Sequence, residues 1–284
     1  MDAILLIAGT AIGAGVLGLP VALRSAGYVP ALVGVASVYL LTLLSGILLA
    51  QLFIENHDKD LPTLFFRHLG KFGATLFNIS YFTLAFCLLV AYWSCLCEIF
   101  GHMVPVVIAA GFLIYYGLRH RFSCLEKLNS ILTTGLIISF AFFIFTIFHS
   151  HGQKFPLFEY GSWSQLPMAL PVILCSFGYH QVIPLVCRQL NHEKKSIMLA
   201  LSIGVFIPFL FNATILTAGF RMFTAEELSR AASLGVPIFS LLTERGSADI
   251  FAHAAQAFSF LAVATSMIGI SMAMKGALHD VLGK

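Results

Sequence analysis

The chain is poor in charge: only 10% of its 284 residues are Asp, Glu, Lys or Arg, whereas 59% are hydrophobic. Soluble domains carry about 25% charged residues, so this composition cannot cover the surface of a soluble globule. The net charge is only +3, which gives no electrostatic support for a nucleic-acid partner. We therefore expect an all-α polytopic membrane protein whose surroundings are the lipid bilayer.

The chain also lacks the cysteine and leader patterns of other protein classes. Its six cysteines include no C-x-x-C pair, the spacing typical of redox and zinc sites, and we expect all six to be small buried apolar side chains. No Lys or Arg precedes the first apolar run, so the N-terminus does not resemble a cleaved signal peptide. We expect no metal, no cofactor and no catalytic residue.

Apolar runs divide the sequence into candidate membrane spans, each of which needs about 20 residues. The eight runs cover residues 3–25, 29–54, 72–100, 102–118, 126–148, 166–190, 196–220 and 250–274. Roughly two thirds of the 16 Lys and Arg residues fall in the connections on one side of these spans. Because positive charge marks the cytoplasmic side, we expect both termini to be cytoplasmic.

Two connections carry helix signals of their own. The stretch "DLPTLFFRHLG" (60–70) has a proline at its start and a mixed apolar and basic composition, which predicts a short helix on the cytoplasmic interface. The stretch "TAEELSRAASLGVP" (224–237) opens with a capping box of Thr224 and Glu227. Two short helices near 224–245 then form an outer lid; the alternative is a plain surface loop.

Two spans are interrupted at their middle. "GTAIGAGVLGLP" (9–20) places four glycines and a proline in the first span, and "PVILCSFGYHQVIP" (171–184) interrupts the sixth. Unpaired backbone groups are tolerated in a membrane only where they line a cavity or meet a ligand. Two interrupted helices at corresponding positions of inverted repeats indicate the substrate site of a secondary transporter.

The chemistry of such a pair suits a zwitterion. Free N–H groups at a half-helix N-terminus attract a carboxylate, while free carbonyl oxygens attract an ammonium group or a small cation. An odd number of spans separates the two breaks, so the two helices run in opposite directions. The alternative is that the glycines only form a close-packing seam between membrane helices.

Three segments carry a resemblance to a known family: "AGTAIGAGVLGLPVALRSAGY", "SFGYHQVIP" and "LAVATSMIGISMAMKGALHDVLG". They resemble the hydroxy and aromatic amino acid permeases, above all the tyrosine-specific branch, of the amino acid–polyamine–organocation superfamily. The resemblance implies a leucine-transporter-like fold of two inverted five-helix repeats. Residues 1–150 then form the first repeat and residues 151–284 an incomplete second one, because family members have more spans than are predicted here.

The resemblance also implies substrate-binding positions. The substrate carboxylate is expected on backbone groups of the first break, at Gly13, Ala14 and Gly15. The ammonium group is expected near carbonyls of the second break, at Ser176, Phe177 and Gly178. The side chains of Phe177 and Tyr179 are expected to be aromatic walls beside the substrate ring.

Three further residues are candidates for ion or proton coupling. Thr265 and Ser266 resemble the hydroxyl pair that completes a cation site in sodium-coupled relatives of the fold, although such hydroxyls also pack between helices. His180 adjoins the second break and titrates near physiological pH; the alternative is a neutral histidine bonded to freed backbone.

The implied function is import of an aromatic amino acid, with tyrosine preferred, by proton symport with alternating access across the bacterial inner membrane. The alternatives are a sodium-coupled amino acid transporter and a truncated, membrane-inserted remnant without transport activity. An intramembrane hydrolase that uses Ser176 or Ser266 with His180 is disfavoured, because no oxyanion hole or second acid accompanies them.

Overall fold

The computed structural model describes residues 1–56, 60–100, 111, 115, 122–149, 161–235, 241 and 249–283. Nearly all of the expected span 102–118 and the second expected lid helix, after residue 237, lie outside these residues. Within them the protein is helical, and six helices are long and apolar enough to cross a membrane. It is therefore a multi-pass membrane protein; the count of eight spans stays a prediction.

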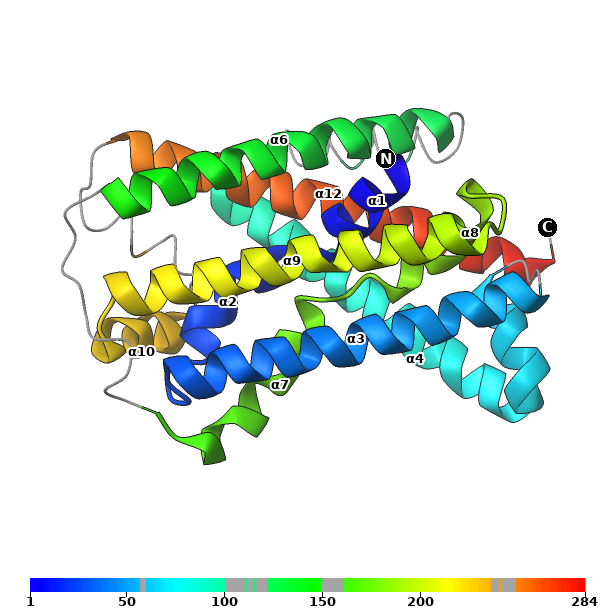
Figure 1. Cartoon of the computed structure of the whole chain (residues 1–284), viewed down its shortest axis with the longest axis horizontal. Coiled ribbons are helices and arrows are strands. Elements are labelled where there is room, and N and C mark those ends of the chain that lie inside the picture. The colour runs from blue at the N-terminus through cyan, green and yellow to red at the C-terminus, as the bar shows by residue number, and fades with distance from the viewer. Residues whose placement is uncertain are drawn as a thin grey trace.

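Long helices run along the long axis of the molecule, and the shorter pieces of the two broken helices lie among them (Figure 1). The long helices are α3 (Tyr28–Asn56), α4 (Leu61–Phe100), α6 (Phe122–His149), α9 (Lys194–Met222) and α12 (Asp249–Leu282). Both chain termini lie toward one end of this axis, and the short helix α10 (Ala225–Leu234) lies at the other.

Both expected breaks are present. The first span consists of α1 (Asp2–Ala11) and α2 (Ala14–Ala22), separated by two residues. The sixth consists of α7 (Leu166–Cys175), a 3₁₀ turn η2 (His180–Val182) and α8 (Ile183–Gln189). The two broken helices run in opposite directions along the axis, as predicted (Figure 1).

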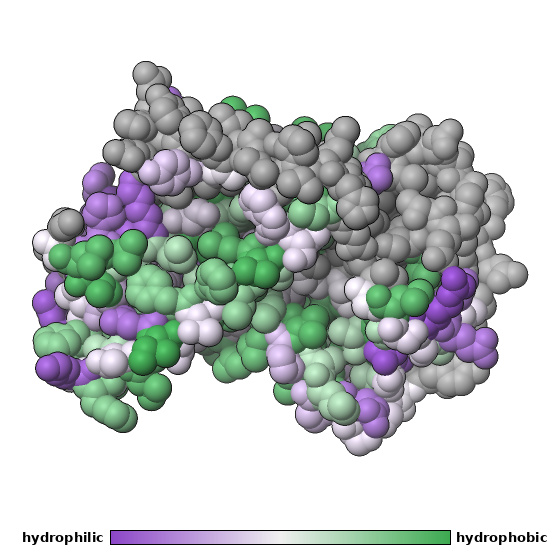
Figure 2. Space-filling model, turned by 180° about the vertical axis from the view of Figure 1, so that it is seen from behind, coloured by the Kyte–Doolittle hydropathy of each residue, from purple (hydrophilic) through white to green (hydrophobic). Residues whose placement is uncertain are grey.

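The outer surface of the helices is apolar, as lipid contact requires. On α3 the side chains of Leu40, Leu41, Leu44 and Leu48 are all exposed. Where the surface is not covered by grey atoms, hydrophilic residues gather toward the two ends and apolar ones lie between them (Figure 2). This arrangement matches a belt of hydrocarbon around the middle of the molecule.

The lipid-facing surface also corrects the expectation for the cysteines. Cys187 is buried, but Cys87 and Cys175 are exposed. The prediction was wrong for these two. For Cys87, on the long span of α4, the lipid is as favourable an environment as the core, whereas Cys175 lies near the buried Tyr92. Cys87, Cys175 and Cys187 form no disulfide.

Two of the helices expected in the connections are present, the one before Gly70 and the first lid helix. Gly70 adopts φ 66°, ψ −172° and turns the chain between the first turns of α4 and its long span, so residues 61–69 make a separate short helix. At α10, the amide of Glu227 donates to the Thr224 hydroxyl and the Glu227 carboxylate accepts from the Thr224 amide. Gly235 ends α10 in the left-handed conformation, φ 68°.

The last span is longer than predicted. Its expected end at residue 274 rested on the charge of Lys275, yet α12 continues to Leu282. A charged residue near a membrane surface does not stop a helix, because its side chain can extend into the interface. The extra turns carry Asp280 to the start of α4, where it accepts hydrogen bonds from Thr63.

Candidate functional site

The two breaks meet at Ser176. A Cβ placed on Gly15, in the first turn of α2, would lie 3.5 Å from the Ser176 amide nitrogen and 3.6 Å from its Cα. The start of α2 and the end of α7 therefore pack against each other at van der Waals distance. Two predicted substrate-binding positions from opposite halves of the chain are thus adjacent.

Ser266 of α12 contacts the backbone at the break of the first span. Its hydroxyl lies 3.0 Å from the carbonyl oxygen of Gly9 and 3.1 Å from those of Thr10 and Ile12. One hydroxyl proton cannot serve three acceptors at once, so this fully buried point is rich in oxygen lone pairs. Carbonyls at the C-terminal end of a half-helix and in the unwound backbone after it coordinate the coupling ion in transporters.

Thr265 behaves differently from its neighbour. Its hydroxyl donates within its own helix, to the carbonyls of Leu261 and Ala262 at 2.9 and 3.1 Å. A Cβ on Gly9 would lie 3.3 Å from the Cβ of Thr265, so Thr265 packs against α1 without donating to its carbonyls. The two hydroxyls of the predicted pair therefore point to different acceptors.

Tyr92 of α4 reaches the same place and was missed from sequence as a site residue. A Cβ on Gly13 would lie 2.8 Å from the Tyr92 hydroxyl and 3.0 Å from the Ser266 hydroxyl. In the sequence, Tyr92 adjoins Trp93, and such pairs are commoner in the aromatic belt at the membrane interface. The structure separates the two, because Trp93 lines an apolar groove between α4 and α12 with Met267.

The second break is held from α9 by Asn212, which sequence reasoning also missed. The Ser176 hydroxyl donates to the carbonyl of Ile173 at 2.7 Å, one turn earlier in α7. The side-chain nitrogen of Asn212 donates to the Ser176 hydroxyl oxygen at 3.1 Å and reaches the Ser176 carbonyl at 3.4 Å. A polar side chain on an apolar membrane helix was the available signal.

The other side of the second break faces α3. The Tyr179 hydroxyl donates to the carbonyl of Thr42 at 2.6 Å, and a side chain on Gly46 would overlap that hydroxyl. His180 Nε2 lies 2.8 Å from the Ser45 hydroxyl, and the rings of Tyr179 and His180 stack with centroids 4.5 Å apart. These two residues attach the break to α3.

Phe177 also turns toward α3. It is fully buried, and its ring centroid lies 6.4 Å from that of Tyr39, which stacks on Phe209 of α9 at 4.7 Å. Gly178 follows in the turn, where its amide donates to the Cys175 carbonyl at 3.3 Å. The expected aromatic walls thus lie against α3, and their contact with a substrate ring stays a prediction.

Neither Ser176 nor Ser266 pairs with His180 in the described residues. His180 faces Ser45, while the hydroxyls of Ser176 and Ser266 donate to backbone carbonyls. A hydrolase needs its base within hydrogen-bond reach of the nucleophile. The geometry therefore gives no support to the hydrolase alternative.

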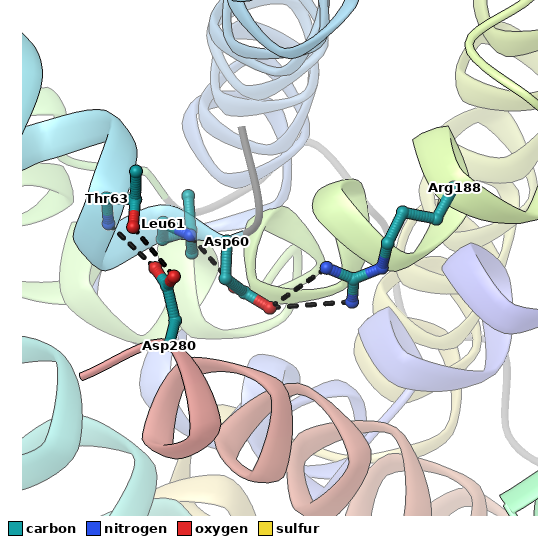
Figure 3. A network of polar contacts seen from close by, with 5 residues as sticks. All are labelled: Asp60, Leu61, Thr63, Arg188 and Asp280. Atoms are coloured by element: carbon teal, nitrogen blue, oxygen red, sulfur yellow. Dashed lines mark hydrogen bonds and ion pairs between the residues drawn. The ribbon is translucent and has the colours of Figure 1, made fainter. Parts of the chain in front are cut away.

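A second polar network joins three helix ends at the end of the molecule that carries the C-terminus (Figure 3). Asp60 caps α4 by accepting the Leu61 amide at 2.9 Å and forms an ion pair with Arg188 of α8 at 3.4 Å. Beside it, Asp280 of α12 accepts from the Thr63 amide and hydroxyl at 2.8 and 2.7 Å. The network joins the second half of the sixth span to α4 and α12.

Asp60 is almost fully buried, whereas the Arg188 side chain is 40% exposed. Burial raises the pKa of Asp60 to about 6; the Leu61 amide and Arg188 oppose this rise, and the nearby Asp280 adds to it. A Cβ on Gly276 of α12 would lie 2.5 Å from the Asp60 carboxylate, so the glycine permits this close packing.

Known proteins match the chain along its length. A model of the tryptophan/tyrosine permease family matches residues 1–284. The "Tyrosine-specific transport system 1" of Haemophilus influenzae is 25% identical, over 98% of this chain and 72% of that protein. The "Tryptophan-specific transport protein" of Shigella flexneri is 24% identical, over 100% of this chain and 73% of that protein. The similarity therefore includes both broken helices and α12.

Proposed function

Because the chain belongs to the tryptophan/tyrosine permease family, we propose that it is a secondary active transporter that imports an aromatic amino acid, with tyrosine preferred, by proton symport. The family assignment makes it an aromatic amino acid permease and a transporter rather than an enzyme. The substrate and the coupling ion belong to the proposal.

The proposal includes a leucine-transporter-like architecture. Residues 1–150 and 151–284 are assigned to two inverted repeats, in the bacterial inner membrane with both termini cytoplasmic. The opposite directions of the two broken helices (Figure 1) are the feature that supports this assignment. Alternating access then consists of these helices rocking against the long helices around them, with α10 part of an outer lid.

The contact between the breaks at Ser176 is the observation that carries the proposed function. The amides of Gly13, Ala14 and Gly15 begin α2, and groups at a helix N-terminus favour a carboxylate. The carbonyls of Ser176, Phe177 and Gly178 lie across the contact and suit the ammonium group. The ring of the substrate is placed against Phe177 and Tyr179.

Sodium coupling is a second candidate, favoured by the position of Ser266. Its hydroxyl occupies a point surrounded by three carbonyl oxygens of the first break, and a small cation at that point would interact with the same oxygens. Proton coupling requires a titrating group near the site, and His180, bonded to Ser45 beside the second break, is the one we assign.

Uptake by proteoliposomes that hold this chain tests the proposal. Radiolabelled tyrosine is supplied under an imposed pH gradient with sodium omitted, with tryptophan as competitor. We expect uptake that tryptophan reduces and that an ionophore abolishes by collapsing the gradient. A sodium requirement without a pH requirement would favour the second candidate.

Binding in detergent separates the remaining outcomes. Tyrosine that binds without being taken up would support the remnant alternative, in which the site forms and transport does not follow. Failure to bind either tyrosine or tryptophan would contradict the proposed function altogether.

A further inference from the structure

Asn212 is a polar residue buried within an apolar membrane helix. It lies on α9 (Lys194–Met222), none of its surface is exposed, and its neighbours Phe211 and Ile215 belong to an apolar cluster. Its side-chain nitrogen contacts the Ser176 hydroxyl and carbonyl oxygens. Polar side chains inside membranes are costly, so such a residue marks a functional contact.

The orientation of the Asn212 amide follows from its partners. The Ser176 hydroxyl gives its proton to Ile173, so its oxygen can only accept from Asn212, and the Ser176 carbonyl can only accept as well. Both contacts need the NH₂ group, which turns the Asn212 Oδ1 atom away from Ser176. That oxygen is buried and has no hydrogen-bond partner among the described residues.

A buried carbonyl oxygen without a donor is unfavourable and rare in native proteins. The position of the Asn212 Oδ1 atom restricts which group could donate a hydrogen bond to it. Ser176 is also the residue that Gly15 approaches from the first break, so Asn212 stands where the two breaks meet. A substrate carboxylate only accepts hydrogen bonds, and the ammonium group is the strong donor at that end of an amino acid.

We propose that Asn212 is a substrate-binding residue whose Oδ1 atom accepts a hydrogen bond from the substrate ammonium group, while its NH₂ group holds Ser176 in place. The inference rests on the proposed function and deepens it. It gives the site a side-chain acceptor for the ammonium in addition to the backbone carbonyls of the second break. A transporter with such a group selects α-amino acids over their deaminated acids.

The test measures ligand affinity in three variants of the full chain. Asn212→Leu removes both polar atoms at similar volume, and Asn212→Asp keeps an oxygen acceptor but loses the donor. Thr214→Val is the matched control, because Thr214 is a half-buried residue of the same helix whose hydroxyl bonds only within it, to Leu210. Thermal melting in detergent establishes that each variant is folded.

Three ligands separate the ends of the substrate. Tyrosine carries both charged groups, tyramine keeps the ammonium without the carboxylate, and 3-(4-hydroxyphenyl)propionate keeps the carboxylate without the ammonium. Phenylalanine serves as a fourth, since it lacks the ring hydroxyl that could otherwise donate to Asn212. Dissociation constants are obtained by competition against radiolabelled tyrosine.

We expect Asn212→Leu to weaken tyrosine, tyramine and phenylalanine roughly 10- to 100-fold, the loss of a hydrogen bond to a charged group. In the same variant, the affinity for the propionate should change less than about threefold. Asn212→Asp should retain tyrosine affinity better than Asn212→Leu does. Thr214→Val should bind all four ligands as the wild type does.

Equal weakening of tyrosine and the propionate would show that Asn212 acts only through the fold of the break and would overturn the inference. So would unchanged tyrosine affinity in Asn212→Leu, or loss in Asn212→Asp as large as in Asn212→Leu. Loss for tyrosine but not for phenylalanine would assign the contact to the ring hydroxyl instead. A wild-type chain that binds none of these ligands would overturn the proposed function together with the inference.

Discussion

The breaks in the two helices are stabilised by different kinds of contact. The first break is two residues long, and its shape depends on glycines that let α7, Tyr92 and Ser266 approach the backbone. The second is longer, and side chains from α3 and α9 hold it: Thr42 accepts from Tyr179, and Asn212 donates to Ser176. The first break should therefore be sensitive to added volume and the second to lost hydrogen bonds.

The same contrast appears at the far ends of these helices. The second half of the sixth span is tied by the ion pair of Arg188 with the buried Asp60. The first half of the first span has a lighter attachment, a hydrogen bond of 3.2 Å from Ser130 of α6 to Asp2 in an exposed position. Exposed contacts of this kind contribute little to stability, so α1 depends on the burial of its apolar side chains rather than on a polar tie at its end.

Added volume at the first break should produce the largest effect. Gly15→Leu is expected to abolish tyrosine binding, by more than about 100-fold, because a branched side chain cannot fit beside Ser176. Gly15→Ala is the matched control, since its Cβ would meet Ser176 at ordinary van der Waals distance. Equilibrium binding in detergent gives the affinities, and the amount of membrane-inserted protein shows that both variants insert.

Unchanged tyrosine binding in Gly15→Leu would contradict both the site and the contrast between the breaks. Equal losses in Gly15→Ala and Gly15→Leu would mean that backbone freedom of glycine, rather than space, is what the position requires.

The sequence predicts the breaks well because their cause is local. Glycines and prolines interrupt a helix wherever they stand, so both breaks and their opposite directions followed from spacing alone. Tyr92 and Asn212 could not be predicted in the same way. Their roles depend on which face of α4 and α9 turns toward the breaks, and helices that are apolar all round carry no periodicity that tells the core from the lipid.

The end network was missed for a related reason. Asp60 and Asp280 are more than 200 residues apart and both looked like ordinary loop or terminal charges. Only the continuation of α12 past Lys275 brings Asp280 to Thr63. Helix ends are the least certain part of a prediction from sequence, and this network is built from helix ends.

Asp60, which pairs with Arg188 at the end of the sixth span, should make the stability of the protein depend on pH. The folded pKa of Asp60, about 6, is above its ordinary value of 3.8, so the folded protein binds the proton more tightly than the unfolded chain. Asp60 therefore contributes most to stability below about pH 4, and this contribution is lost as pH rises toward 6, by up to about 3 kcal/mol.

Thermal melting between pH 4 and 7 in wild type and Asp60→Asn measures this contribution. Asparagine keeps an oxygen that can cap α4 at Leu61 but does not titrate, so the variant should lose the part of the pH slope that belongs to Asp60. Identical slopes in the two proteins would mean that Asp60 does not titrate in this range.

The Ser266 hydroxyl, at the first break, should contribute more to the free energy of unfolding than the hydroxyl of its neighbour Thr265. Ser266→Ala removes the donor to the carbonyls of the first break and should lower the free energy of unfolding by about 1–2 kcal/mol. Thr265→Val removes a hydroxyl that bonds only within its own helix and should cost less. Melting temperatures in the same detergent compare the two, and a larger loss in Thr265→Val would reverse the assignment.

The smallest effect is expected at the second break, where Tyr179→Phe removes one hydroxyl and keeps the ring. The lost hydrogen bond to Thr42 should lower the free energy of unfolding by about 1 kcal/mol, since the Thr42 carbonyl has its own helical partner on α3. If the ring forms a wall of the substrate site, tyrosine affinity should stay within about threefold of the wild type, whereas Tyr179→Ala should lose it. A large loss of tyrosine affinity in Tyr179→Phe would instead indicate that the Tyr179 hydroxyl contacts the substrate. The hydrogen bond from Tyr179 to Thr42 of α3 would then not be the contact that stabilises the second break.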